Sequence, residues 1–90
     1  MYFGNVQSRK IKLSYEYTIT GNTYYVQGDF DRAMEMYQKS LKINSEVGHK
    51  LGMAYTYEDI GRVYRKLGQK NKAQVAEEKA SKLFKLLKTK

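Results

Sequence analysis

Hydrophobic side chains recur every three or four residues along most of the chain, which is the spacing of an α-helix with one apolar face. The spacing is clearest in the second half, at Leu51, Ala54, Tyr55, Tyr57, Ile60, Val63, Tyr64 and Leu67. It breaks at Gly28, around residues 47–50 and at Gly68, where a glycine ends a helix in the left-handed conformation without a steric penalty. The pattern predicts an all-α fold with helices near residues 7–26, 30–46, 50–66 and 70–88.

The sequence also repeats itself with a period of forty residues. Residues 9–45 align with residues 49–85 without a gap, so that Gly21 pairs with Gly61 and Gly28 pairs with Gly68. Each copy reads as a helix, a glycine turn and an antiparallel helix. We therefore expect one domain, residues 1–90, with repeat 1 at about 9–47 and repeat 2 at about 49–88.

Two of the paired glycines, Gly21 and Gly61, lie inside predicted helices. Glycine in a helix interior costs about 1 kcal/mol relative to alanine, so its presence indicates that a neighbouring helix approaches closely there. Ala33 and Ala73 are expected to serve the same purpose on the partner helix. Asp29 follows the first glycine turn and is expected to cap the next helix through its carboxylate.

The repeated residues also match a known motif. The first copy carries Tyr17, Gly21, Tyr24, Gly28-Asp29-Phe30, Ala33 and Tyr37, and the second carries Tyr57, Gly61, Tyr64, Gly68, Ala73 and Ala80. Over residues 14–85 this pattern resembles the tetratricopeptide repeat, in its variety with a forty-residue period. Thr20 departs from the usual leucine, and Ser45 and Lys85 stand where the shorter variety has a helix-ending proline. The resemblance implies two tandem helical hairpins, a fragment of a right-handed α-solenoid.

The resemblance further implies a protein-interaction scaffold, because in this family the first helices of the repeats line a concave groove that holds a partner peptide. Carried over by position, the groove residues would be Tyr15, Thr18, Asn22, Tyr25, Tyr55, Glu58, Arg62 and Arg65. Asn22 matches a family asparagine that bonds the peptide backbone. Thr18 and Asp59 depart from the carboxylate clamp of chaperone-binding members, so recognition of chaperone C-termini is not implied.

The residues themselves point to a partner that carries acidic groups. The chain has a net charge of +8, divided into +2 for residues 1–45 and +6 for residues 46–90. Arg62 and Arg65 lie one helical turn apart, so they are either solvated or able to fork onto a carboxylate of the partner. The expected partner is a protein or a peptide with acidic residues.

The basic C-terminal half leaves a second interpretation open. Lys79, Lys82, Lys85, Lys88 and Lys90 accompany apolar residues on the last helix, a pattern compatible with a nucleic-acid-associated or regulatory protein. A helical array must also cover its last apolar face, so Leu83, Phe84 and Leu87 are expected to mediate self-association into a homo-oligomer.

No catalytic or metal-binding pattern is present in the sequence. His49 is the single histidine, it falls in the turn between the repeats, and the chain has no cysteine. No glycine-rich loop follows a strand. We therefore expect neither an enzyme nor a cofactor or metal site. No apolar run reaches the roughly 18 residues needed for a membrane span, and the lack of cysteine suits a cytoplasmic location.

Overall fold

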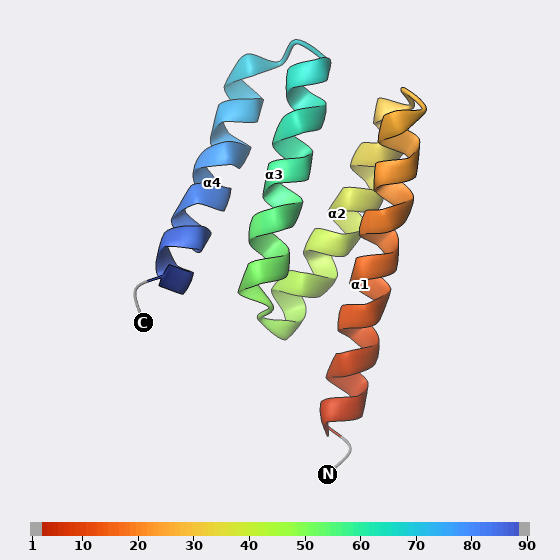
Figure 1. The fold of residues 1–90 in the computed structure, drawn as a ribbon, viewed down its shortest axis with the longest axis vertical. Helices are drawn as coiled ribbons and strands as arrows, with labels where there is room; N and C mark the ends of the chain where they lie inside the picture. Colours follow the sequence, from red (N-terminus) through yellow and green to blue (C-terminus); the bar gives the residue numbers. More distant parts are fainter. Residues whose placement is uncertain (1–2, 89–90) are drawn as a thin grey trace.

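The computed structural model describes residues 3–88, and within this range the chain forms four helices and no strand. They are α1 (Phe3–Val26), α2 (Phe30–Val47), α3 (Lys50–Lys66) and α4 (Lys70–Lys88). The helices run alternately in opposite directions and follow one another across the molecule in chain order (Figure 1). The predicted all-α fold and its two helical hairpins are confirmed, although α1 begins four residues earlier than predicted. Lys90 of the basic C-terminal pattern lies outside the described residues.

The turns between the helices are built on the expected glycines. Gly28, Gly48 and Gly68 have φ values of 81°, 71° and 76°, in the left-handed region that a side chain disfavours. At the start of α2, the Asp29 carboxylate accepts the backbone N–H of Arg32 at 3.2 Å, as predicted for a helix cap. These local signals fix where each helix stops and the chain reverses.

Polar contacts join α1 to α2 at three successive turns. The atom pairs are the Ser14 hydroxyl and Asn44 Oδ1 at 2.9 Å, the Thr18 and Ser40 hydroxyls at 2.8 Å, and the Tyr37 hydroxyl donating to Asn22 Oδ1 at 2.5 Å. Ser14, Ser40 and Asn44 are buried, and an unpaired polar group at such a place costs about 1–3 kcal/mol. The three pairs therefore set the register of the first hairpin.

The second hairpin lacks this ladder. At the equivalent positions, forty residues later, it has Ala54 with Phe84, Glu58 with Ala80, and Arg62 with Glu77. Ala54 and Ala80 are buried, so α3 and α4 pack there through small apolar side chains. The two hairpins thus share a backbone plan but differ in the chemistry that holds each pair of helices together.

Both mid-helix glycines lie at close helix contacts, as the sequence predicts. A Cβ atom on Gly21 would stand 2.7 Å and 2.8 Å from two ring carbons of Tyr37, which is completely buried. A Cβ atom on Gly61 would lie 3.1 Å from Cγ of Glu77 and 3.4 Å from the carbonyl oxygen of Ala73. The first glycine therefore faces a fixed ring, whereas the second faces the stem of a flexible side chain.

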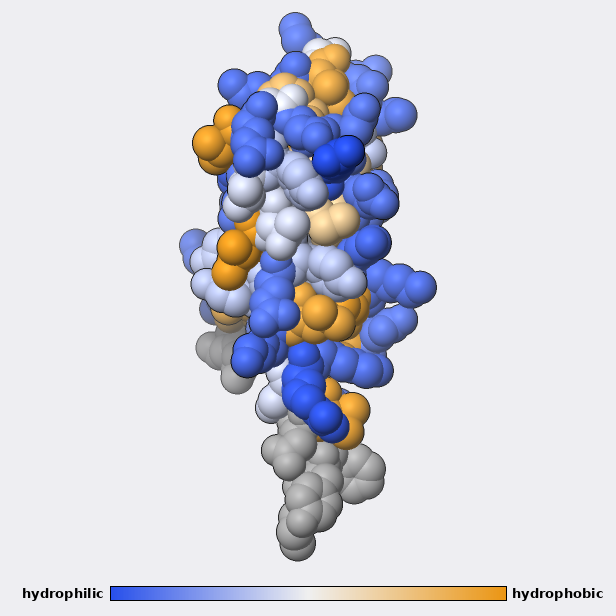
Figure 2. Space-filling view, turned by 90° about the vertical axis from the view of Figure 1, so that its right-hand side faces the viewer, coloured by the Kyte–Doolittle hydropathy of each residue, from blue (hydrophilic) through white to orange (hydrophobic). Residues whose placement is uncertain are grey.

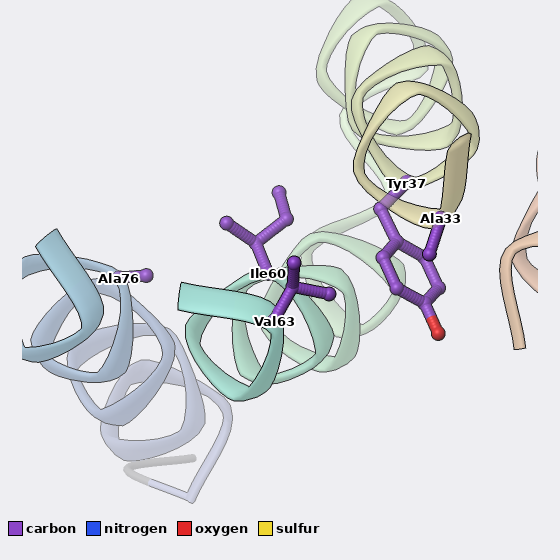
Figure 3. Close-up of a cluster of buried hydrophobic side chains, with 5 residues drawn as sticks. All are labelled: Ala33, Tyr37, Ile60, Val63 and Ala76. Atoms are coloured by element: carbon purple, nitrogen blue, oxygen red, sulfur yellow. The ribbon is translucent and has the colours of Figure 1, made fainter. Parts of the chain in front are cut away.

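The core joins the two hairpins to each other. Figure 3 shows Ala33 and Tyr37 on α2 facing Ile60 and Val63 on α3, with Ala76 on α4 on the other side of α3. Four of these residues are entirely or almost entirely hidden from solvent, and Ile60 is only 6% exposed. Burial of their apolar surface is what stabilises the contact between the repeats.

The outer face of α1 is polar where the matching face of α3 is apolar. Glu16, Thr20 and Thr23 are exposed on α1, and the equivalent residues of α3 are Thr56, Ile60 and Val63, all buried against the first repeat. Figure 2 shows this edge of the molecule, on which hydrophilic side chains predominate and hydrophobic ones are scattered in separate small groups. A polar outer face of this kind is typical of the end of a helical array.

We predict that Gly21→Ala destabilises the protein by about 1–3 kcal/mol, because the new methyl group overlaps the ring of Tyr37 in a filled core. Urea unfolding followed by circular dichroism measures the change.

The matched variant is Gly61→Ala, for which we expect a change within about 1 kcal/mol, since the Glu77 side chain is able to move and alanine favours the helix. Gly61→Leu, by contrast, reaches the Ala73 carbonyl and Ala76 and should cost about 1–3 kcal/mol. Equal stabilities for Gly21→Ala and wild type would contradict this account of the helix contact.

Candidate functional site: a concave groove between the first helices

A hollow of about 370 Å³ lies between α1 and α3, and it is closed at one end by the turn that precedes α3. Its apolar surface comes from Ile11, Tyr15, Leu51 and Tyr55. These residues form two pairs related by the forty-residue repeat, so the two first helices contribute equivalent side chains. His49 adds an imidazole at the closed end.

The two tyrosines of this groove are unusually accessible. Tyr15 is 66% exposed to solvent, and Tyr55 is 53% exposed. The Tyr55 ring packs edge-on against Phe84 of α4, with the ring centroids 5.2 Å apart. The contact orients Tyr55 and leaves its other faces open to the groove, which suits a side chain that combines a rigid apolar body with a polar tip.

The polar side chains of the groove wall are already paired within the chain. The Thr18 hydroxyl contacts that of Ser40, and Asn44 contacts Ser14. Among the described residues, no buried side-chain nitrogen or oxygen is left without a hydrogen-bond partner. The side chains of this groove that remain accessible include the two tyrosines and Leu51.

Farther along the first helices, a charged cluster bridges the two repeats. The guanidinium carbon of Arg62 lies 5.6 Å from the centre of the Tyr25 ring, and Nη2 of Arg62 is 3.1 Å from Oδ1 of Asp59. Burial raises the pKa of Asp59 to about 6, with Arg62 opposing the rise and Glu58 adding to it. Burial, reinforced by the negative charge of Asp59, likewise raises the pKa of Tyr37 to about 12.

Arg65 takes part in a separate ion pair with α4. Its Nε and Nη2 atoms donate to the two carboxylate oxygens of Glu77 at 2.6 Å and 2.7 Å. This bidentate hydrogen bond lowers the pKa of Glu77 and raises that of Arg65. The pair joins the two helices of the second hairpin. Glu77 stands forty residues after Tyr37, so it takes the position that the Tyr37 ring has in the first hairpin.

The structure divides the eight sequence-predicted groove residues into separate groups. Tyr15, Thr18 and Tyr55 line the hollow between α1 and α3. Asn22, Tyr25 and Arg62 lie in the inter-repeat cluster, and Asn22 already accepts the hydroxyl of Tyr37. Glu58 lines a different hollow, with Glu77 and Phe84, and Arg65 turns toward α4.

The expectation for the two arginines changes accordingly. Arg62 and Arg65 do not point at one vacant carboxylate position, because each already has an internal carboxylate partner. The sequence left solvation of the two arginines open as the alternative, and both side chains are about half exposed, at 52%.

Several contributors were missed at the level of sequence, among them Ile11, Leu51 and Asp59. Leu51 shares a helix face with Tyr55, four residues away, so the helical spacing contains the signal for its place in the groove. Asp59 stands where the first repeat has Ile19, and this polar replacement marks a difference between the copies. Its burial, however, depends on how α3 packs against the first hairpin.

Four antiparallel helices in two equivalent hairpins, with a groove between their first helices, define a helical-repeat protein. A family model described as Tetratricopeptide repeat matches residues 18–85, and the chain belongs to this family. Repeats of this family are generally protein–protein interaction modules and form a non-catalytic scaffold. Comparisons with curated proteins and with solved structures found no match.

Two kinds of feature are absent from the described part of the chain. Between residues 3 and 88, no helix is long and apolar enough to cross a membrane. In the same range, no three histidine, cysteine or acidic side chains gather as the ligands of a metal ion would.

We predict that Asp59 makes stability depend on pH. Its pKa is higher in the folded chain than in the unfolded chain, so the folded state holds the proton more tightly and the carboxylate becomes unfavourable as the pH rises from about 4 to above 6. Relative to wild type, Asp59→Asn should gain stability across this window, by about 1–3 kcal/mol at neutral pH.

Urea unfolding of both proteins at several pH values measures this difference. Glu78→Gln removes one exposed carboxylate from α4 and serves as the control for the loss of a negative charge. An Asp59→Asn gain of the same size at pH 4 and pH 7 would show that burial of the carboxylate is not its cause.

Proposed function

We propose that this chain is a non-catalytic interaction module that binds a partner peptide in the groove between α1 and α3. The observation that carries the proposal is the pair of accessible tyrosines, Tyr15 and Tyr55, facing one hollow beside Ile11 and Leu51. Exposed aromatic and aliphatic side chains grouped in a concave site are typical of recognition surfaces.

The peptide that fits this groove carries an apolar or aromatic side chain, with acidic residues toward the second repeat. The apolar anchor would lie against Tyr15 and Tyr55, where the groove offers rings and aliphatic side chains. The acidic preference is supported by the charge of +6 on residues 46–90 and by the half-exposed arginines. A guanidinium has five N–H donors, and the internal pairs leave several of them for a partner carboxylate.

The remaining first-helix residues would contact the flanking parts of the peptide. In this proposal Tyr25 and Arg62 present a stacked ring and guanidinium at the boundary between the repeats. Thr18 lies in the wall of the groove, and Asn22 and Glu58 would flank it, Asn22 from the hydrogen-bonded ladder of the first hairpin and Glu58 from the neighbouring hollow beside Phe84.

The test selects peptides from a random phage-displayed library on the immobilised protein and measures their affinity by fluorescence anisotropy. We expect Tyr15→Ser combined with Tyr55→Ser to weaken the selected peptides by about tenfold or more, because interface tyrosines often contribute over 1 kcal/mol each. Val26→Ser is the matched control, since Val26 is 85% exposed and lies outside the groove.

Unchanged affinity of the tyrosine double variant, with its helical circular dichroism retained, would sink the groove proposal. The alternative function, nucleic-acid association through the basic half, is tested by a separate experiment. It requires retention on a DNA or RNA column that falls steeply with salt.

Self-association through α4 stays a separate prediction. Leu83 and Phe84 are half-buried, and Phe84 packs against Tyr55 within the same chain, whereas Leu87 is 37% exposed. If α4 pairs with a second copy, sedimentation at tens of micromolar shows a species heavier than 10.5 kDa, and Leu87→Glu shifts it to the monomer. A wild-type monomer under these conditions would show that the exposed surface of α4 needs no second copy.

A further inference from the structure

A second hollow, of about 490 Å³, lies between α2 and α4 and shares no residue with the concave groove. The helix between them in Figure 1, α3, forms its floor. Leu41, Ile60 and Val75 line it with aliphatic surface, one from each helix, and Val75 is 51% exposed. The hollow is therefore an apolar site that is accessible from solvent.

Two lysines of α4 give this hollow its charge. Nζ of Lys72 lies 5.8 Å from the centre of the Tyr64 ring, and Nζ of Lys79 lies 5.5 Å from that of Tyr57. The hollow contains no carboxylate, and within the part of the chain that the structure describes neither lysine forms an ion pair. The tyrosine rings hold both ammonium groups beside the apolar floor by cation–π attraction.

The spacing of these groups matches a helix. Lys72 and Lys79 are seven residues apart on α4, which places them about 10.5 Å apart along the helix axis. Tyr57 and Tyr64 repeat at the same two-turn interval on α3. A helix laid along the hollow repeats its side chains at this interval, with the positions three and four residues onward facing the floor between the lysines.

The first repeat has equivalent cation–π pairs but a different side chain beside them. Arg32 stacks on Tyr24 at 5.8 Å and Lys39 on Tyr17 at 5.6 Å. Glu35, however, stands where the second repeat has Val75. A carboxylate at that position supplies the negative charge that the hollow of the second repeat lacks.

A second copy of this chain does not supply the missing charges. Its nine acidic residues include no two that are seven positions apart, so none of its helices offers carboxylates at the spacing of the lysines. A helix of a second copy is therefore not the matching occupant.

We propose that the hollow between α2 and α4 is a second docking surface, and that its ligand is an acidic amphipathic helix of a partner protein. In that helix, two carboxylates at positions i and i+7 form ion pairs with Lys72 and Lys79. Apolar side chains at i+3 and i+4 cover Leu41, Ile60 and Val75. Together with the concave groove, this surface lets the module hold two segments at once, on different sides of α3.

The test uses a synthetic helical peptide with two glutamates seven residues apart and leucines at the two intervening positions on the same face. A second peptide with lysines in place of the glutamates is its control. Fluorescence anisotropy measures binding to the 90-residue chain, and amide shifts in NMR spectra locate the site. We expect the acidic peptide alone to bind and to shift Gln38, Leu41 and Val75 rather than Ile11 and Leu51.

Lys72→Glu combined with Lys79→Glu should weaken the acidic peptide by about tenfold or more, because each reversal replaces an attraction with a repulsion. Lys10→Glu combined with Lys12→Glu changes the net charge equally, on exposed residues of α1 that line no hollow, and should have little effect. Val75→Ser tests the apolar floor without a charge change, and circular dichroism confirms that each variant folds.

Three results would overturn the proposal. The first is equal weakening of peptide binding by the Lys72/Lys79 and the Lys10/Lys12 double variants, which would mean unspecific charge attraction. The second is a set of amide shifts that maps to the concave groove. The third is absence of binding at the highest soluble peptide concentration. The first and the third of these outcomes do not depend on whether a peptide binds between α1 and α3.

Discussion

The contact between the Tyr37 ring and Gly21 is the constraint on which the rest of the structure depends. The ring is completely buried, and it fits only because the glycine lacks a Cβ atom. From this position its hydroxyl reaches Asn22 on α1, while the ring belongs to the same buried cluster as Ile60 and Val63 on α3. One side chain thus fixes the first hairpin internally and provides the surface on which the second hairpin packs.

The two repeats reach the same shape through different chemistry, and this difference determines which surfaces are free. The first hairpin uses its inward-facing polar groups for the ladder between α1 and α2, so Thr18 and Asn22 are committed to internal bonds. In the second hairpin, Glu77 replaces the tyrosine and binds Arg65 across the helix pair. The accessible side chains that remain include the tyrosines of the concave groove and the lysines along α4.

Equivalent positions of the two repeats also differ in burial, because α3 packs against a preceding hairpin and α1 does not in this structure. Ile60 and Val63 of α3 pack against the preceding hairpin, whereas the equivalent Thr20 and Thr23 of α1 are exposed to solvent. Burial at the inter-repeat joint has a cost as well, since it raises the pKa of Asp59 to about 6. The protein thus combines a polar outer edge with an ionisable joint between its repeats.

Helical periodicity and glycine turns determine the four helices and the turns between them, because these are local properties of each segment. The forty-residue register identifies Tyr15 and Tyr55 as equivalent groove residues. The ion pair of Arg65 with Glu77 and the partial burial of Asp59 depend on side chains brought together from different helices. Interactions of this kind are decided by the angle and distance at which the helices pack, and only the tertiary structure specifies them.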